Sequence, residues 1–255
     1  MHGADVLQGL HSIIVNSTLK DALSPTLKFA ALSAALVHDI GHPGRNNKFL
    51  CDEEHLLAIK YHDRSVLENF HIATALEISN IDGCNIFEKM ESKETYKEIR
   101  QTWIDMILDT DMARHFTVVK ELNAKIAAAA ANNASFSCSE QPNHAFTLSV
   151  LLHCCDLGNP TKKFEVYQQW TSRVMEEFHS QAETEFEAGR KPSMPRNDDK
   201  FNLPNFQKGF LRFIRPFFVS VTIIDGVNLS ELIQNLDDNL KEWDEIARLQ
   251  EEEKG

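Results

Sequence analysis

The run HDIGHPG, from His38 to Gly44, places an imidazole and a carboxylate on adjacent residues at the end of an apolar segment. A second carboxylate, Asp156, ends another apolar segment far downstream. A polar side chain buried in such a place costs free energy unless a partner satisfies it. A divalent cation would be such a partner, because these ions accept mixed imidazole and carboxylate ligands. The pattern predicts a metal centre, although an isolated His-Asp pair is more often a capping or hydrogen-bonded histidine.

The segments that must position these side chains have helical periodicity. Apolar residues recur at a spacing of three to four, as in Phe29, Leu32 and Leu36, and strand alternation is essentially absent. Ser24-Pro25 and His42-Pro43-Gly44 bound a predicted helix. We therefore predict an all-α protein. Three further segments are predicted as follows: a solvated helix end or loop at Ala127 to Ser139, a long loop at Gly189 to Pro204, and an acidic amphipathic helix from Leu229 to Gly255.

Composition limits the classes of partner. A chain of 255 residues can bury a full core, and we interpret residues 1–255 as one domain. The formal charge of −12 predicts no nucleic-acid partner. No stretch approaches the ~20 apolar residues of a membrane span, and the first residues lack the features of a signal peptide. Five cysteines without a CxxC pair indicate a reducing compartment, so we expect a cytoplasmic protein in which Cys154 and Cys155 are both buried small residues.

Six motifs in a fixed order carry a more specific signal. They are HDIGHPGRNNKFL, SVLEN followed by His71, Thr110-Asp111-Met112, CDLGNPTK, YQQW and QKGF. In these motifs and their order the chain resembles the class I 3′,5′-cyclic nucleotide phosphodiesterases over nearly its whole length. The resemblance implies a compact bundle of many α-helices, of the HD type, with a deep metal-containing pocket. That fold agrees with the helical periodicity.

The resemblance also implies two divalent ions. Four side chains would hold a tightly bound ion, usually Zn²⁺: His2, His38, Asp39 and Asp156. Asp39 would bridge to a second ion, Mg²⁺ or Mn²⁺, held mostly through water. Three more side chains would orient those waters: His42, Glu68 and Thr110. Two ions about 3.5–4 Å apart would activate a bridging hydroxide and hold the phosphorus for in-line attack. From the residues alone, Glu68 would be an ordinary exposed charge and Thr110 a helix hydroxyl.

A purine pocket is implied by the same resemblance. Gln207 would hydrogen-bond the purine edge, and Phe210 would stack on one face opposite Val174. The remaining lining residues would be Asn159, Tyr167, Trp170, Phe178 and Met194. Part of this set would contribute mainly packing, because its spacing of three and four residues also describes a core stripe of a helix. The pair Gln207 and Phe210 is the stronger candidate, since a glutamine among phenylalanines needs a hydrogen-bond partner.

The chain departs from the family pattern in three places, one of which is the adjacent pair Cys154-Cys155. Gly41 stands where many members carry an Asp, so a hydrogen bond from that side chain would be absent. The family motif His-Asn-x-x-His-x-x-Asp-Val is present only in its second half, from His2 to Val6. Its first histidine, the general acid that protonates the departing 3′-oxygen, would lie four residues before His2. We therefore expect a catalytic domain that lacks this acid and its N-terminal helices.

These observations predict metal-dependent hydrolysis of cAMP, with cGMP as a second substrate, to the 5′-monophosphate in cyclic-nucleotide signal transduction. The choice of purine stays open, because a glutamine amide can turn to meet either edge, and so does a homodimer. One alternative is another HD-type phosphohydrolase, such as a nucleotidase, which would share His38, Asp39 and Asp156 without needing Gln207 and Phe210. The other is a catalytically impaired fragment that binds only metal, nucleotide or a partner chain.

Overall fold

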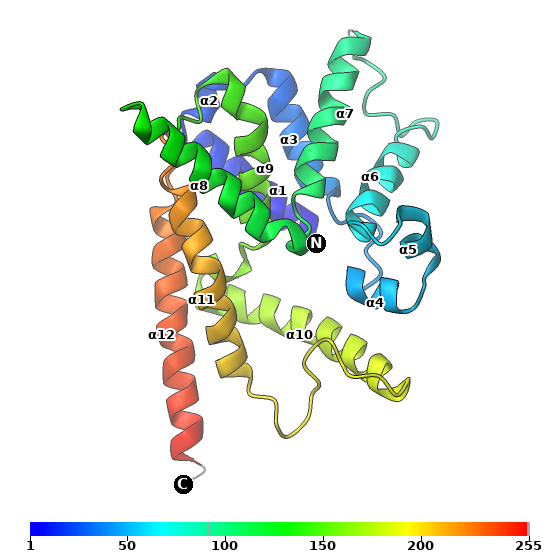
Figure 1. Ribbon diagram of the computed structural model, residues 1–255, viewed down its shortest axis with the longest axis vertical. Coiled ribbons are helices and arrows are strands. Elements are labelled where there is room, and N and C mark those ends of the chain that lie inside the picture. Colours follow the sequence, from blue (N-terminus) through cyan, green and yellow to red (C-terminus); the bar gives the residue numbers. More distant parts are fainter. Residues whose placement is uncertain (91, 254–255) are drawn as a thin grey trace.

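The computed structural model describes residues 1–90 and 92–253, and helices dominate them (Figure 1). The α-helices are α1 His2–Val15, α2 Leu19–Ala22, α3 Pro25–Val37, α4 Asn47–Asp52, α5 Leu56–Tyr61, α6 Val66–Ile78, α7 Lys93–Leu108, α8 His115–Ala131, α9 His144–Asp156, α10 Phe164–Glu187, α11 Leu203–Val221 and α12 Ser230–Glu252. Three short 3-10 helices are η1 Met112–Arg114, η2 Gln141–Asn143 and η3 Asn159–Thr161. Among the described residues the only β-pairing is an isolated bridge between Ser137 and Asp225. The prediction of an all-α protein is confirmed.

The predicted helix boundary at Ser24-Pro25 is confirmed and has a local cause. The Ser24 hydroxyl accepts a hydrogen bond from the Leu27 amide at 3.1 Å, and Pro25 occupies the first turn, where its missing N–H is not needed. At the other end α3 stops at Val37, and Gly41 then adopts a left-handed conformation with φ of 75°. The HD pair therefore lies just beyond the end of a helix.

The core around the HD pair is a bundle of α1, α3, α7 and α9, which pack on one another. Small residues allow α3 to approach its neighbours closely: Ala30, Ala31, Ala34 and Ala35 are fully buried. Gly3 does the same for α1, because a Cβ at this position would lie 2.4 Å from the Leu36 carbonyl oxygen. The contact fixes the start of α1 beside the end of α3.

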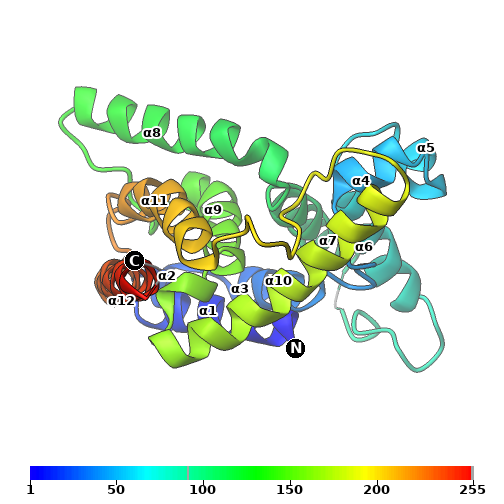
Figure 2. The same ribbon diagram turned by 90° about the horizontal axis from the view of Figure 1, so that it is seen from below.

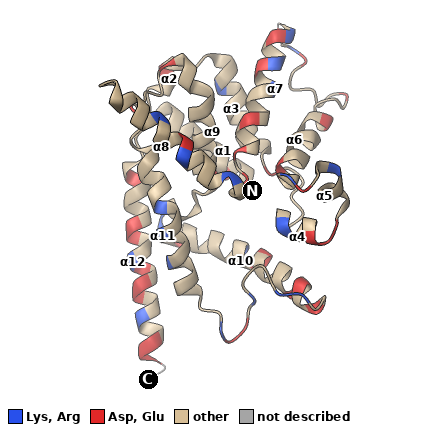
Figure 3. Cartoon of the chain, in the orientation of Figure 1, with Lys and Arg blue, Asp and Glu red and all other residues tan. Residues whose placement is uncertain are grey.

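A second group of helices, α8, α10, α11 and α12, lies beside this bundle (Figures 1 and 2). α11 and α12 lie side by side, while α8 and α10 run along opposite sides of the molecule (Figures 1 and 2). The predicted loop at Gly189 to Pro204 is confirmed, since α10 ends at Glu187 and α11 begins at Leu203. The acidic terminal helix is confirmed as α12 (Figure 3), although residues 254–255 lie outside the described residues. No helix in the described part of the chain has the length and apolarity to cross a membrane.

A small satellite made of α4, α5 and the start of α6 lies beside the main bundle (Figure 1). It has its own buried cluster of Leu50, Ala58, Val66 and Leu67. Its connections are irregular, with left-handed backbone at Glu54, His62, Asp63 and Ser65. The biased stretch at Ala127 to Ser139 combines both predicted forms, because α8 continues to Ala131 and a loop follows.

One prediction about burial is half wrong. Cys154 is buried, but Cys155 is only partly buried and borders a cavity between α1, α9 and the start of α12. The reason is local: Cys155 faces α1 at Gly9, which has no side chain to cover it. All five cysteines are free.

Candidate metal centre

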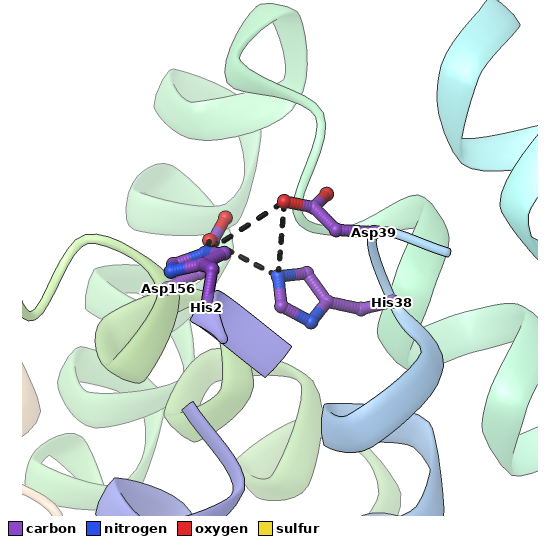
Figure 4. Close-up of side chains that lie close together, drawn as sticks. All are labelled: His2, His38, Asp39 and Asp156. Atoms are coloured by element: carbon purple, nitrogen blue, oxygen red, sulfur yellow. Dashed lines mark hydrogen bonds and ion pairs between the residues drawn. The ribbon is translucent and has the colours of Figure 1, made fainter. Parts of the chain in front are cut away.

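Four side chains from three segments meet at the junction of α1, α3 and α9 (Figure 4). The Asp156 Oδ1 atom lies 2.8 Å from His2 Nε2 and 3.2 Å from His38 Nε2. The Asp39 Oδ2 atom lies 3.7 Å from each of the same two nitrogens. These donor atoms are all within 4.8 Å of one another. The structure thus brings together the four residues predicted as ligands of one ion.

Local contacts fix the direction of the imidazoles. The His38 Nδ1–H donates to the Ala35 carbonyl at 2.8 Å, so the Nε2 atom of this fully buried ring points into the cluster. Such a bond selects the tautomer that a metal-ligating histidine needs. His2 reaches the same point because the contact at Gly3 holds α1 against the end of α3. His71 adds a further contact, since its Nε2 lies 3.8 Å from Asp39 Oδ1 while its Nδ1–H donates to the Ile40 carbonyl at 2.7 Å.

The electrostatics of the cluster suit a bound cation. Burial disfavours the charged form of His38, but attraction to Asp156 and Asp39 outweighs it and raises the pKa of His38 to about 9. Burial likewise opposes ionisation of Asp156, yet the neighbouring His38 and His2 hold the pKa of that carboxyl well below its usual value. A divalent ion is coordinated by such atoms at about 2.0–2.2 Å, so ligand atoms around it lie roughly 3–4 Å apart. The donor set and its spacing therefore fit one divalent ion.

Two cavities meet at this cluster. The larger, of about 680 Å³, is bordered by His2, Asp39 and Asp156 and extends along α10 and α11. Five of the residues predicted for the purine pocket line it: Asn159, Trp170, Val174, Phe178 and Phe210. The smaller, of about 340 Å³, shares Asp39 and Asp156 and lies toward the satellite. The three residues predicted to orient waters all line it: His42, Glu68 and Thr110.

Three residues predicted for the purine pocket do not border the larger cavity. Tyr167 and Gln207 are buried, and the Tyr167 hydroxyl donates to Gln207 Oε1 at 2.7 Å. The glutamine therefore has the partner that its apolar surroundings require. Met194 lies on the loop between α10 and α11, next to Ser193, which is tied to α10. The roles of all three stay predictions.

Residues for which the sequence predicted no role also border the site. Asn47 and Asp111 line the smaller cavity, and Glu177 lines the larger one, 4.0 Å from His42 Nδ1. Of these three residues, Glu177 is the one that the sequence could have indicated, because it follows Val174 by three residues and so shares a face of α10 with it. Gly41, where the family pattern has an Asp, leaves no room for a longer side chain without movement, since a Cβ would lie 3.1 Å from the Phe70 ring.

Comparisons of this chain with known proteins agree on one protein family. A family model described as 3′5′-cyclic nucleotide phosphodiesterase matches residues 1–236. The chain is 32% identical over 245 residues to mouse 3′,5′-cyclic-AMP phosphodiesterase 4C, covering 95% of this chain and 35% of that protein. It is 35% identical over 257 residues to human high affinity cAMP-specific and IBMX-insensitive 3′,5′-cyclic phosphodiesterase 8A, covering 95% of this chain and 31% of that protein. The chain thus spans about a third of the length of these two relatives.

Solved structures agree with the sequence comparison. The phosphodiesterase domain of the RhoPDE fusion protein from the choanoflagellate Salpingoeca rosetta superposes with a TM-score of 0.88 at 31% identity, covering 98% of this chain and 78% of that one. LmjPDEB1, solved in complex with IBMX, gives a TM-score of 0.86 at 27% identity, covering 97% and 73%. The helical arrangement around the four-residue cluster is therefore one that known phosphodiesterase domains adopt.

Proposed function

Because the chain belongs to the 3′,5′-cyclic nucleotide phosphodiesterase family, we propose that it hydrolyses the 3′-phosphoester bond of cyclic nucleotides to give the 5′-monophosphate. We propose cAMP as the preferred substrate and cGMP as a second one, since both curated relatives are named for cAMP. The observation that carries the proposal is the meeting of His2, His38, Asp39 and Asp156 where a cavity bordered by Trp170, Val174, Phe178 and Phe210 joins a smaller one bordered by Asp39, Glu68 and Asp111. A phosphodiester needs the polar side chains of the smaller cavity, and a purine needs the apolar ones of the larger cavity.

The family is metal-dependent, and we propose Zn²⁺ for the four-residue cluster and Mg²⁺ or Mn²⁺ beside Asp39. Imidazole with carboxylate is a common Zn²⁺ ligand set, and Mg²⁺ keeps most of its waters. When bound, such ions polarise phosphoryl oxygens and lower the pKa of coordinated water. His2, His38, Asp39 and Asp156 would hold the first ion, and Asp39 would also face the second.

The residues of the smaller cavity would order water and substrate. Burial raises the pKa of Glu68 to about 7, with nearby Asp111 adding to the effect, so its carboxyl group can accept or release a proton near neutrality. The Thr110 hydroxyl donates to the Ile107 carbonyl at 2.8 Å, which leaves its oxygen free to accept from water. The His42 Nδ1 atom accepts from the Gly44 amide at 3.1 Å, so a neutral His42 ring carries its proton on Nε2.

The larger cavity would hold the nucleoside. Trp170 lies edge-on to His2 with ring centroids 5.7 Å apart, so it borders both the cluster and the cavity. Val174 and Phe178 follow Trp170 at intervals of four residues along α10, and Phe210 comes from α11. Apolar walls from two helices suit a flat base. We assign Gln207, held by Tyr167, to orient the base edge, with Asn159, Tyr167 and Met194 as supporting residues.

The same proposal includes the domain, the cellular compartment and the partners of the reaction. We propose that residues 1–255 act as one catalytic domain in cytoplasmic cyclic-nucleotide signalling. The charge of −12 argues against nucleic acid as a partner. A homodimer is the assembly that we would test by light scattering coupled to size-exclusion chromatography.

The direct test is an assay of the purified chain with Zn²⁺ and Mg²⁺ against cAMP, cGMP and nucleoside 5′-monophosphates, with products separated by chromatography. We expect 5′-AMP from cAMP and loss of this product in Asp156→Asn. Release of phosphate from 5′-monophosphates with cyclic nucleotides untouched would identify a nucleotidase instead. Tight metal binding without hydrolysis of any of these compounds would support the non-catalytic alternative.

A further inference from the structure

The N-terminus of α6 is not capped by the residue that precedes it. Ser65 occupies the N-cap position with φ of 43°, and its side chain makes no capping hydrogen bond. The Ser65 hydroxyl instead donates to Asp111 Oδ2 at 2.7 Å. Amides in the first turn of a helix have no partner within the helix, so they need an acceptor from elsewhere.

Asn47, at the start of α4, supplies that acceptor from across the satellite. Its Oδ1 atom accepts from the Leu67 amide at 2.8 Å. Its Nδ2 atom donates to the Glu68 carboxylate, at 2.9 Å from Oε2 and 3.3 Å from Oε1. One amide group thus bonds the backbone of α6 with its oxygen and the next side chain with its nitrogen. A side-chain amide offers both an acceptor and a donor, which neither a carboxylate nor an alkyl group does.

The bond to Glu68 matters because of where that carboxylate lies. Glu68 and Asn47 both line the smaller cavity, together with Asp39 and Thr110. A glutamate has several rotatable bonds, so holding it in one orientation costs conformational entropy unless a neighbour fixes it. Asn47 fixes the carboxylate and, through the Leu67 amide, also fixes the helix turn that carries it.

We propose that Asn47 is a positioning residue of the active site that acts through Glu68, a role that rests on the proposed hydrolysis of cyclic nucleotides. A residue that served only as a helix cap would affect the stability of α6 and leave turnover unchanged. A positioning residue affects turnover even when the cap is kept. The two roles can be separated because the amide oxygen caps α6 at Leu67, whereas the amide nitrogen bonds the Glu68 carboxylate.

Asn47→Asp keeps an oxygen for the Leu67 amide but removes the donor and places a second carboxylate against Glu68. We expect a kcat about 10–100-fold lower with KM within about twofold, since small misplacement of a reacting group costs up to about 10²-fold. Because the cap is kept, any loss of melting temperature should come only from repulsion between the two carboxylates, and one tightly bound ion per chain should remain. Asn47→Ala loses both bonds, so it should lower kcat similarly and also lower the melting temperature by about 2–4 °C.

Ser92→Ala is the matched control, because the Ser92 hydroxyl caps α7 by accepting from the Thr95 amide at 3.1 Å, away from both cavities. It should lower the melting temperature as Asn47→Ala does and leave kcat unchanged. A wild-type kcat in Asn47→Asp would overturn the positioning role while the proposed function stands. Absence of cyclic nucleotide hydrolysis by the wild-type chain would overturn both.

A double-mutant cycle tests the route through Glu68. In the Glu68→Gln background, Asn47→Asp should lower kcat by no more than about twofold, because the group on which it acts is already lost. An equal fold-loss of kcat in both backgrounds would show that Asn47 acts independently of Glu68 and would overturn the proposal.

Discussion

The Asp156 carboxylate is the residue on which the cluster depends most. It ends α9 and bonds both His2 and His38, so it links α1 and the end of α3 to the core. Removing it leaves two imidazoles with no partner of opposite charge except Asp39. A buried ligand set that loses a carboxylate loses both affinity for a cation and the charge balance that kept the set together.

We therefore expect Asp156→Ala to lose tightly bound metal and to lower hydrolysis of cAMP by at least about 10³-fold, because a missing ligand removes the activation of water. Elemental analysis of the purified variant gives the metal content, and a chromatographic assay gives the rate. Cys155→Ala, one residue away but outside the cluster, is the control. Wild-type metal content and turnover in Asp156→Ala would contradict the assignment.

The pair formed by Tyr167 and Gln207 controls a different property, the orientation of an amide. The Tyr167 hydroxyl donates to Gln207 Oε1, which favours the orientation of the amide that turns its oxygen toward Tyr167. In Tyr167→Phe this restraint is lost, so the amide can turn to meet either purine edge. We expect the ratio of kcat/KM for cAMP to that for cGMP to move toward one.

Gln207→Ala is the companion variant for this prediction. It should lower kcat/KM for both nucleotides by roughly tenfold to a hundredfold, since an unpaired base edge costs ~1–3 kcal/mol. Metal content should stay at the wild-type level in both variants. A substrate ratio unchanged in Tyr167→Phe would show that Tyr167 does not set the amide orientation.

At the scale of helices, contacts of α10 determine how the long loop is held. Glu185 and Gln181, one turn apart on α10, are both buried. The Glu185 carboxylate accepts from the Ser193 amide at 2.5 Å and from the Ser193 hydroxyl at 2.6 Å. Gln181 donates to Ser193 Oγ at 2.9 Å and accepts from the Asn46 amide at 2.9 Å. The loop and the segment that follows the HD pair are thus attached to the same helix turn.

Glu185→Gln should loosen this loop, because a neutral amide accepts more weakly than a carboxylate and one end of it cannot accept at all. Burial opposes ionisation of Glu185, but the hydrogen bonds from Ser193 outweigh it and lower the pKa of this carboxyl. The wild-type loop should therefore loosen only in acid, as pH falls below about 4.5 and through the lowered pKa. We expect faster trypsin cleavage after Arg190 or Arg196 in the variant at pH 7.5. Glu187→Gln, on the exposed end of the same helix, is the control, and equal cleavage rates would contradict the role of Glu185.

The helices show most clearly which features could be predicted from the sequence and which could not. Ser24, Pro25 and the glycines and prolines after α3 predicted the boundaries of α3, because capping is a local interaction. The separate packing of the satellite was not predicted, since it depends on contacts among α4, α5 and α6 and on left-handed turns that helical periodicity does not show. The same limit applies to the site: motifs named the four clustered residues, but the bonds of Asn47 and Tyr167 depend on tertiary contacts that no spacing shows.

At the scale of the whole molecule, the four-residue cluster joins α1, α3 and α9. The charges of the cluster balance differently with and without a bound cation. In the metal-free protein His38 and His2 take protons that Asp156 and Asp39 attract, and the pKa of His38 is raised to about 9. A bound ion would replace those protons, because ligating imidazoles must be neutral. The stability of the metal-free fold should therefore fall as these protons are lost with rising pH, and the extra stability given by a bound ion should grow over the same range.

The sign follows from linkage. A histidine whose folded pKa lies above its ordinary 6.5 stabilises the fold fully below pH 6.5, and this contribution is lost as pH rises through about 9. The depressed pKa of Asp156 affects stability only in acid, and His153, whose pKa burial lowers to about 4, affects it only below pH 6.5. Between pH 6.5 and 9 the two cluster histidines contribute most, and Glu68, whose pKa burial raises to about 7, adds a loss of stability of the same sign that ends soon above pH 7.

We therefore expect the melting temperature in the presence of a chelator to fall between pH 6.5 and 9, and the increase produced by added Zn²⁺ to grow over the same range, because a ligand that binds only the folded state stabilises it by mass action. Differential scanning fluorimetry at pH 6.5, 7.5 and 9, with and without metal, measures both trends. His38→Ala should lose both, whereas His11→Ala, an exposed histidine on α1, should keep them. A melting temperature that rises with pH in the chelated protein, or a Zn²⁺ effect that shrinks, would show that these four side chains do not form a metal centre linking α1, α3 and α9.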